Sequence, residues 1–204
     1  MWKRLFGRRQ KKQPDIIIVS GLPRSGTSMM MRMLEAGGIE IVTDHIRKAD
    51  EDNPQGYYEL EKVKKIKQDY TFLNETYGKV FKMISMLLYD LPLDKSYKII
   101  FMKRNMTEIL NSQKIMLQRN AKDRSENNDD TSMGNLFEKH INDITAWLAQ
   151  QPNTEVIYIN YNDVITAPLA SAQAVEQFLD RRLNVDKMAA VVDHTLYRNR
   201  VSSP

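Results

Sequence analysis

The sequence predicts an α/β fold in which a mainly parallel central sheet is flanked by helices. Short apolar runs without polar alternation, such as Ile16–Val19 and Ile99–Met102, are typical of strands buried on both faces. Segments with helical spacing separate these runs, and strands that alternate with helices pair in parallel through right-handed crossovers. The 204 residues, 42% of them hydrophobic, are enough to form the core of one such domain.

The elements can be placed in order along the chain. The β-branched run at 15–20 predicts the first strand, and the glycine-containing stretch at 21–26 predicts a turn. A helix is expected at 27–36, because apolar residues recur at helical spacing and Gly37-Gly38 ends the pattern. Further strands are expected at 40–42, 79–85, 97–103 and 155–159, and further helices at 60–70, 107–119 (with Thr107 as its N-cap), 136–150, 167–180 and 185–192.

The composition excludes several classes of protein. The chain has no Cys, which rules out a disulfide scaffold, a zinc finger and a cysteine nucleophile. Three His residues leave little material for a metal site, and we expect none. No apolar run approaches the roughly 20 residues that a membrane span needs. A cytoplasmic protein is therefore expected.

The positive charge is concentrated at the N-terminus. Six of the 30 Lys and Arg residues lie in residues 1–13, which contain no Asp or Glu. The rest of the chain therefore has 24 Lys and Arg and 26 Asp and Glu. We therefore divide the chain into a basic tail, 1–13, and a single near-neutral domain, 14–204. A domain without a basic face predicts no nucleic-acid partner. Trp2, Leu5 and Phe6 within the tail allow at most a weak, peripheral contact with a membrane surface.

The stretch from Gly21 to Ser28, GLPRSGTS, is the most informative part of the sequence. A glycine loop between a buried strand and a helix binds anions, because backbone N–H groups and the positive end of the helix dipole point at the ligand. Its spacing matches the phosphate-binding Walker A loop and predicts a P-loop-like three-layer sandwich. The side chains expected to contact an oxyanion are those of Arg24, Ser25, Thr27 and Ser28, with Gly26 permitting close backbone approach.

Thr27 stands where a Walker A loop has its Lys. In nucleoside triphosphatases that Lys and a Mg²⁺ ion neutralise the terminal phosphates. The later strand at 97–103 also ends in Lys103-Arg104 and not in the Asp that would hold the metal. A metal-assisted triphosphate site is therefore poorly equipped, whereas a donor with less charge on the transferred group, such as a sulfuryl donor, suits the loop.

A second pair of polar residues follows that later strand. Arg104 lies at the strand's carboxyl end, and Ser112 lies about two turns into the next helix. Both can face the crevice in which open α/β sheets bind ligands, where they could hold a second phosphate.

These two motifs, in this order, resemble the sulfotransferase family, and most closely its tyrosylprotein sulfotransferase branch, whose loop reads GLPRSGT. The resemblance implies that 3′-phosphoadenosine 5′-phosphosulfate (PAPS) gives its sulfuryl group to an acceptor hydroxyl or amine, releases the bisphosphate PAP and needs no metal. It also implies two sets of donor contacts. Arg24, Ser25, Gly26, Thr27 and Ser28 would contact the 5′-phosphosulfate, and Arg104 and Ser112 the 3′-phosphate.

Sulfuryl transfer needs a base for the acceptor proton and a cation near the leaving oxygen. Counting along the sequence from the loop, the resemblance places the base at His45, and Glu59 and Asp44 compete with it. Lys82 matches a strand Lys of the family that assists the leaving group, beside Arg24.

Two alternatives stay open. A P-loop kinase or nucleotide-binding protein would need Mg-ATP, and a non-catalytic relative would bind a nucleotide or a partner without turnover. The class of the acceptor and the oligomeric state are not predicted. Arg198 and Arg200 are further candidates for the 3′-phosphate.

Overall fold

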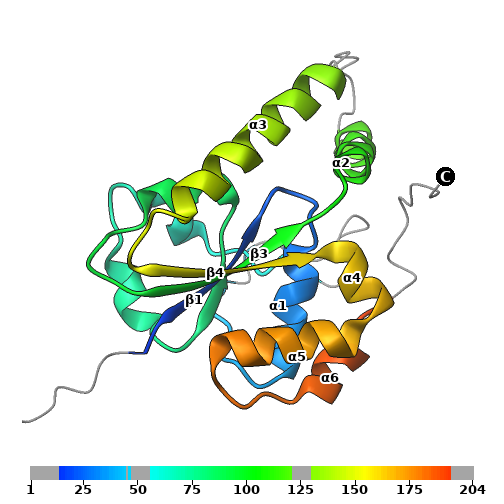
Figure 1. Ribbon diagram of the computed structural model, residues 1–204. Coiled ribbons are helices and arrows are strands. Elements are labelled where there is room, and N and C mark those ends of the chain that lie inside the picture. Colours follow the sequence, from blue (N-terminus) through cyan, green and yellow to red (C-terminus); the bar gives the residue numbers. More distant parts are fainter. Residues whose placement is uncertain (1–13, 45, 47–55, 121–129, 194–204) are drawn as a thin grey trace, which may run out of the picture.

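The computed structural model describes residues 14–44, 46, 56–120 and 130–193. Its sheet has four strands in the order β2-β1-β3-β4, with all neighbours parallel (Figure 1). The strands are β1 (Ile16–Gly21), β2 (Val80–Lys82), β3 (Tyr97–Lys103) and β4 (Thr154–Asn160). The predicted parallel α/β sheet is thereby confirmed.

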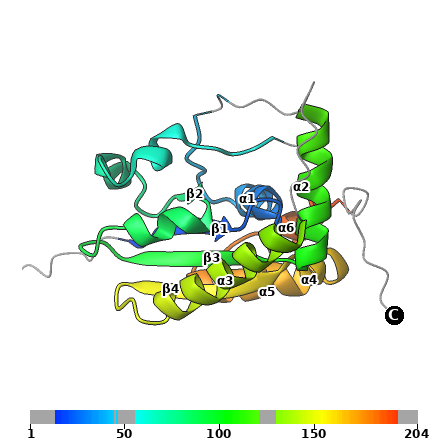
Figure 2. The same cartoon turned by 90° about the horizontal axis from the view of Figure 1, so that it is seen from above.

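Helices connect and cover the strands. Among the described residues the α-helices are α1 (Thr27–Ala36), α2 (Met106–Asn120), α3 (Asp130–Leu148), α4 (Tyr161–Thr166), α5 (Pro168–Leu179) and α6 (Val185–Ala190), and the 3₁₀ helices are η1 (Glu61–Lys65), η2 (Thr71–Glu75) and η3 (Ser85–Asp90). Figures 1 and 2 show α2 standing beyond the carboxyl end of β3.

The core has two halves because successive strand residues point to opposite faces of the sheet. Ile17 and Val19 of β1 pack in the cluster that includes side chains of α1, α5 and α6. Ile16 and Ile18 pack in the other, with side chains of the 3₁₀ helices and α3. Every residue of β1 is buried, which explains its unbroken apolar run. The result is the predicted three-layer sandwich.

Some predicted elements differ in the structure. Residues 40–42 form only an isolated bridge, Ile41 with Val80, because the edge strand β2 is three residues long. The helix expected at 60–70 is the 3₁₀ helix η1 followed by a turn. Its buried apolar residues, Leu60, Val63 and Ile66, recur every third position, which is the 3₁₀ period.

The helix boundaries also needed correction. α2 begins at Met106, and the side chain of Asn105, not Thr107, accepts hydrogen bonds from the first turn, at 2.9 Å from the Thr107 nitrogen. α4 was not predicted as a separate helix. Ala167 precedes Pro168 and leaves helical geometry there, which separates α4 from α5.

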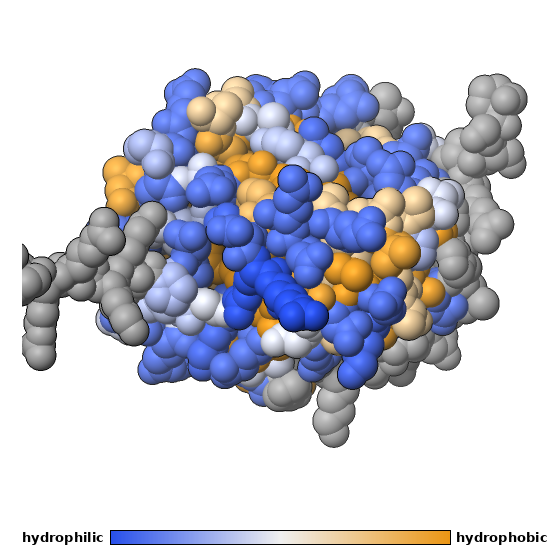
Figure 3. All heavy atoms as spheres, turned by 60° about the horizontal axis from the view of Figure 1, so that its bottom comes forward, coloured by the Kyte–Doolittle hydropathy of each residue, from blue (hydrophilic) through white to orange (hydrophobic). Residues whose placement is uncertain are grey.

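No helix in the described part of the chain is long and apolar enough to span a membrane. The described residues also contain no cluster of three or more His, Cys, Asp or Glu side chains that could hold a metal ion. Figure 3 shows the face over α5 and α6, where hydrophilic and hydrophobic side chains are interspersed.

Candidate functional site

The loop between β1 and α1 lies where the order of the sheet reverses. β1 has β2 on one side and β3 on the other, and the carboxyl ends of these parallel strands meet at one edge. Open α/β sheets bind ligands at this switch point. The fold therefore places the loop at 21–26 at the position of a ligand site.

Two glycines and one strained residue give the loop its shape. At Gly21 an added Cβ would lie 2.6 Å from the Met102 carbonyl oxygen, and at Gly26, where φ is 96°, it would collide with the Tyr161 ring. Arg24 adopts a φ of 69°, a left-handed conformation that costs a non-glycine residue about 1 kcal/mol or more. Strained residues of this kind cluster at ligand-binding sites.

The loop also contains a buried hydroxyl that lacks a partner. Ser25 is only 1% exposed, and its Oγ has no hydrogen-bond partner among the described residues. Buried polar groups are normally satisfied, so an orphaned hydroxyl in an anion-binding loop fits a missing oxyanion. α1 begins at Thr27, directly after the loop, so the positive end of its dipole faces the same place.

The structure brings the two predicted motifs into contact. Arg24 Nε donates to Ser112 Oγ at 2.9 Å, across 88 positions of sequence, and an Arg104 guanidinium N–H donates to the Arg24 carbonyl at 3.0 Å. The first loop and the second pair therefore form one cationic site, and its two arginines are held by groups of both motifs.

Arg104 is fixed by a buried ion pair that the sequence analysis missed. Its Nε lies 2.9 Å from Glu108 Oε2, and the two side chains are 8% and 1% exposed. The guanidinium also stacks on the Tyr161 ring, 4.2 Å from the ring centre. Burial raises the pKa of Tyr161, with Arg104 opposing the shift, so the ring stays a neutral phenol. The i,i+4 spacing of Arg104 and Glu108 was the available signal.

Lys82 lies beside the start of α1. Its Nζ is 3.4 Å from Ser28 Oγ and donates to the Tyr57 carbonyl, which Ser28 Oγ also contacts at 3.4 Å. The strand pairing explains the position, because Lys82 sits at the carboxyl end of β2 opposite Val19. The segment around Tyr57 therefore covers the first turn of α1.

The three candidate bases differ in their surroundings and in whether the structure describes them. Both Asp44 carboxylate oxygens accept backbone N–H groups, from Ile46 at 3.0 Å and from Glu61 at 2.6 Å, so this side chain acts as a cap for η1. Glu59 is half-buried and lies two residues after Tyr57. Its carbonyl accepts from Thr43 Oγ1 at 2.8 Å, which anchors the segment. His45, like Arg198 and Arg200, lies outside the described residues.

Fold and site together define an α/β protein with an oxyanion loop of the P-loop type at the switch point of its sheet. A family model for the sulfotransferase domain matches residues 13–204, and the chain belongs to this family. A comparison with curated protein sequences gives no significant match. The function predicted from the motifs, sulfuryl transfer to an acceptor, is confirmed at the level of the family; the tyrosylprotein branch stays a prediction.

Solved structures agree on the fold. The sulfotransferase domain from the olefin synthase of Synechococcus PCC 7002 has 12% identity and a TM-score of 0.55, with 94% of this chain and 82% of that one aligned. The sulfotransferase domain from the curacin biosynthetic pathway has 15% identity and a TM-score of 0.52, with 95% and 94% aligned. Sulfotransferase STF9 from Mycobacterium avium has 14% identity and a TM-score of 0.52, with 89% and 67% aligned.

Proposed function

We propose that this sulfotransferase takes its sulfuryl group from PAPS and releases PAP. The observation that carries the proposal is the contact between the two oxyanion motifs, Arg24 with Ser112 at 2.9 Å and Arg104 with the Arg24 carbonyl at 3.0 Å. PAPS carries charged groups at two positions of one ribose, the 5′-phosphosulfate and the 3′-phosphate. A site built from two oxyanion motifs offers one motif to each group. A donor with one phosphate chain would need only the first.

The residues fit this donor. Ser25 and the backbone of the loop would hold the 5′-phosphosulfate, together with Gly26, Thr27 and Ser28, and the unsatisfied Ser25 hydroxyl is available to it. Arg104 and Ser112 would hold the 3′-phosphate. Both already contact Arg24, so binding would exchange the hydrogen bond from Arg24 Nε to Ser112 Oγ for bonds to phosphate.

The chemistry follows from the positions of the cations. PAPS supplies an activated sulfuryl group: the acceptor oxygen or nitrogen bonds to sulfur while the bond from sulfur to the 5′-phosphate oxygen breaks. Negative charge grows on that oxygen. Arg24 and Lys82 would stabilise it, since Lys82 Nζ lies 3.4 Å from Ser28 Oγ at the start of α1. The proton of the acceptor must pass to a base of the protein.

We assign the base to Glu59, because its segment contacts the start of α1 through the Tyr57 carbonyl. Glu59→Gln should lower the rate of transfer by about 10² or more, the usual contribution of a general base, with PAP affinity unchanged.

His45→Gln is the matched variant, because His45 was the first prediction from the sequence. It should retain most of the activity. A large loss with His45→Gln together with retained activity in Glu59→Gln would move the base to His45.

The proposal as a whole is tested by transfer from sulfur-labelled PAPS into the metabolites and macromolecules of a cell extract. We expect labelled product and an equal amount of PAP with the wild type, without added Mg²⁺, and neither with Arg24→Ala. If the wild type transfers no label but hydrolyses Mg-ATP or transfers its phosphoryl group, the kinase alternative is favoured.

The cytoplasmic location, the weak membrane contact of residues 1–13 and the division into tail and domain stay predictions.

A further inference from the structure

A polar stripe on α1 leads away from the sulfuryl site. Ser28, Arg32 and Glu35 are spaced by four and three residues and therefore share one face of the helix. Ser28 contacts the Lys82 ammonium at one end of the stripe. Arg32 follows one helical turn later, about 6 Å along the axis.

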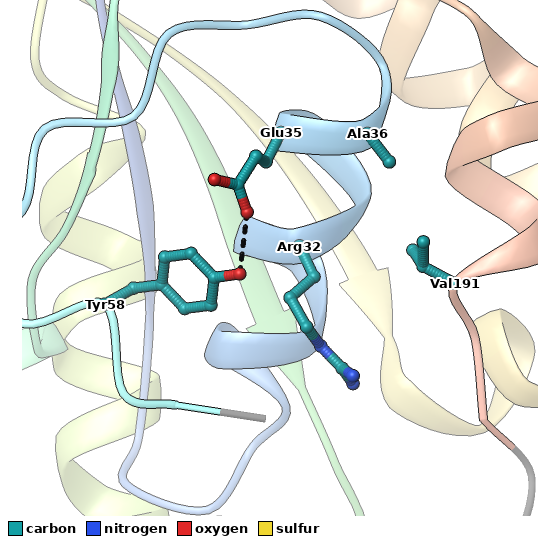
Figure 4. A pocket seen from close by; sticks show the side chains of 5 residues that line it. All are labelled: Arg32, Glu35, Ala36, Tyr58 and Val191. Carbon is teal, nitrogen blue, oxygen red and sulfur yellow. Dashed lines mark hydrogen bonds between the residues drawn. The ribbon is translucent and has the colours of Figure 1, made fainter. Parts of the chain in front are cut away.

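A pocket of about 390 Å³ opens along this stripe, lined by Arg32, Glu35, Ala36, Tyr58 and Val191 (Figure 4). Tyr58 adjoins Tyr57, whose carbonyl contacts both Ser28 and Lys82. The wall of the pocket is therefore continuous with the segment that covers the sulfuryl site. Figure 4 shows the Arg32 side chain directed away from Glu35. Long side chains on a helix lean toward its N-terminus, which for Arg32 is the turn that carries Ser28.

Arg32 is a half-buried cation without a direct counter-ion in the described residues. Its Nε is buried and has no hydrogen-bond partner there. Burial lowers the pKa of its guanidinium, and the longer-range effects of Tyr58, Asp193 and Tyr161 only oppose this. A partly desolvated charge whose buried N–H lacks a partner is costly, and an oxyanion of a ligand would satisfy it.

At the far end of the pocket lies the Glu35 carboxylate, which already has a hydrogen-bond donor within the protein. The Tyr58 hydroxyl donates to Glu35 Oε2 at 2.7 Å, as Figure 4 shows. Burial and this hydrogen bond both raise the pKa of Tyr58, so it stays a neutral donor. The backbone of Tyr58 has a φ of 52°, in the left-handed region. An anion in the pocket is therefore attracted to Arg32 and repelled by Glu35, which fixes its orientation.

We propose that Arg32 binds an oxyanion of the acceptor, a carboxylate above all, and thereby positions the acceptor hydroxyl or amine at the sulfuryl site one helical turn away. This inference rests on the proposed sulfuryl transfer and names the substrate class of the same site. The acceptor is accordingly a small hydroxy or amino acid, or a longer molecule that presents such an end. Arg32 is a residue that determines specificity, and it has no part in the chemical step.

The test compares acids with their neutral amides on protein saturated with PAP. The pairs are 4-hydroxybenzoate and 4-hydroxybenzamide, 3-hydroxybutyrate and its amide, and N-acetylserine and its amide. Calorimetry should give at least one acid an affinity about ten-fold or more above that of its amide, as expected for a charge-assisted hydrogen bond. In nitrogen-edited NMR the Arg32 Nε–H signal should shift with that acid only.

Arg32→Gln should remove the preference for the acid, while Lys187→Gln, which deletes an exposed cation on α6, should retain it. Arg32→Met should also raise the Tm, because it removes a desolvated charge; a purely structural Arg32 would instead leave a less stable protein. PAP affinity should be unchanged in all three variants.

The proposal is overturned if the wild type prefers no acid over its amide, or if Arg32→Gln keeps the preference. Failure of the proposed function has a different signature, because the wild type would then not bind PAP in the saturation step. The two outcomes are thus measured in separate titrations of the same sample.

Discussion

Arg24→Ala should reduce the rate of sulfuryl transfer by about 10² to 10³, the usual loss when a donor to the developing charge is removed. Arg24 lies in the loop between β1 and α1, and its Nε donates to Ser112 of the second motif. Alanine keeps the carbonyl to which Arg104 donates, so the loop retains that support. Single-turnover kinetics with labelled PAPS measure the effect.

Two variants at the same position separate catalysis from loop shape. Arg24→Gly relieves the left-handed φ of 69° and should make the protein more stable by roughly 1 kcal/mol, yet as inactive as Arg24→Ala. Arg24→Lys keeps the charge without the planar fork and should restore only part of the rate. Full activity in Arg24→Gly would contradict a role for the side chain in transfer.

Arg104→Ala should have the largest effect on stability. It leaves the Glu108 carboxylate, 1% exposed, without the guanidinium that lies 2.9 Å away, and removal of one partner of a buried pair costs about 3–5 kcal/mol. It also deletes the cation above the Tyr161 ring and the donor to the Arg24 carbonyl. For a domain of this size the Tm should fall by roughly 10 °C.

A double variant distinguishes structure from ligand binding. Arg104→Ala with Glu108→Ala removes both charges and should recover much of the lost Tm, because no carboxylate is left without its ion-pair partner. It should not recover the preference for PAP over adenosine 5′-phosphate, which depends on Arg104 itself. Recovery of that preference would assign Arg104 a structural role only and remove it from the 3′-phosphate site.

The elements that local pattern determines were predicted well. α1 and β3 have the predicted bounds, because glycines end the helix and the centre of the strand, Ile99–Met102, is an unbroken apolar run. Elements whose form depends on neighbouring segments were predicted less well. The segment at 40–42, expected to be a strand, forms only a single bridge with the short β2. The segment at 60–70, expected to be an α-helix, contains a 3₁₀ helix with a three-residue period. Local propensity carries no information about the partner strand.

The candidate site shows the same difference between features that a local stretch determines and features that depend on distant segments. The loop side chains could be predicted from the sequence because one contiguous stretch determines the geometry of an oxyanion loop. The contact of Arg24 with Ser112, the supporting pair of Arg104 with Glu108 and the pocket at Arg32 depend on approaches between distant segments. Helical spacing from Ser28 to Arg32 indicates a shared face, yet only the fold shows that Tyr58 and Val191 enclose it.

The most direct test of the central claim, a donor site with two phosphate subsites, is a thermal-shift titration with PAP, adenosine 5′-phosphate and ATP, each with and without Mg²⁺. The account predicts that PAP raises the Tm by several degrees regardless of Mg²⁺, since a ligand at a hundred times its Kd adds about 2.7 kcal/mol. Adenosine 5′-phosphate should bind far more weakly. Equal shifts with the two nucleotides, or a shift that only Mg-ATP produces, would contradict the account.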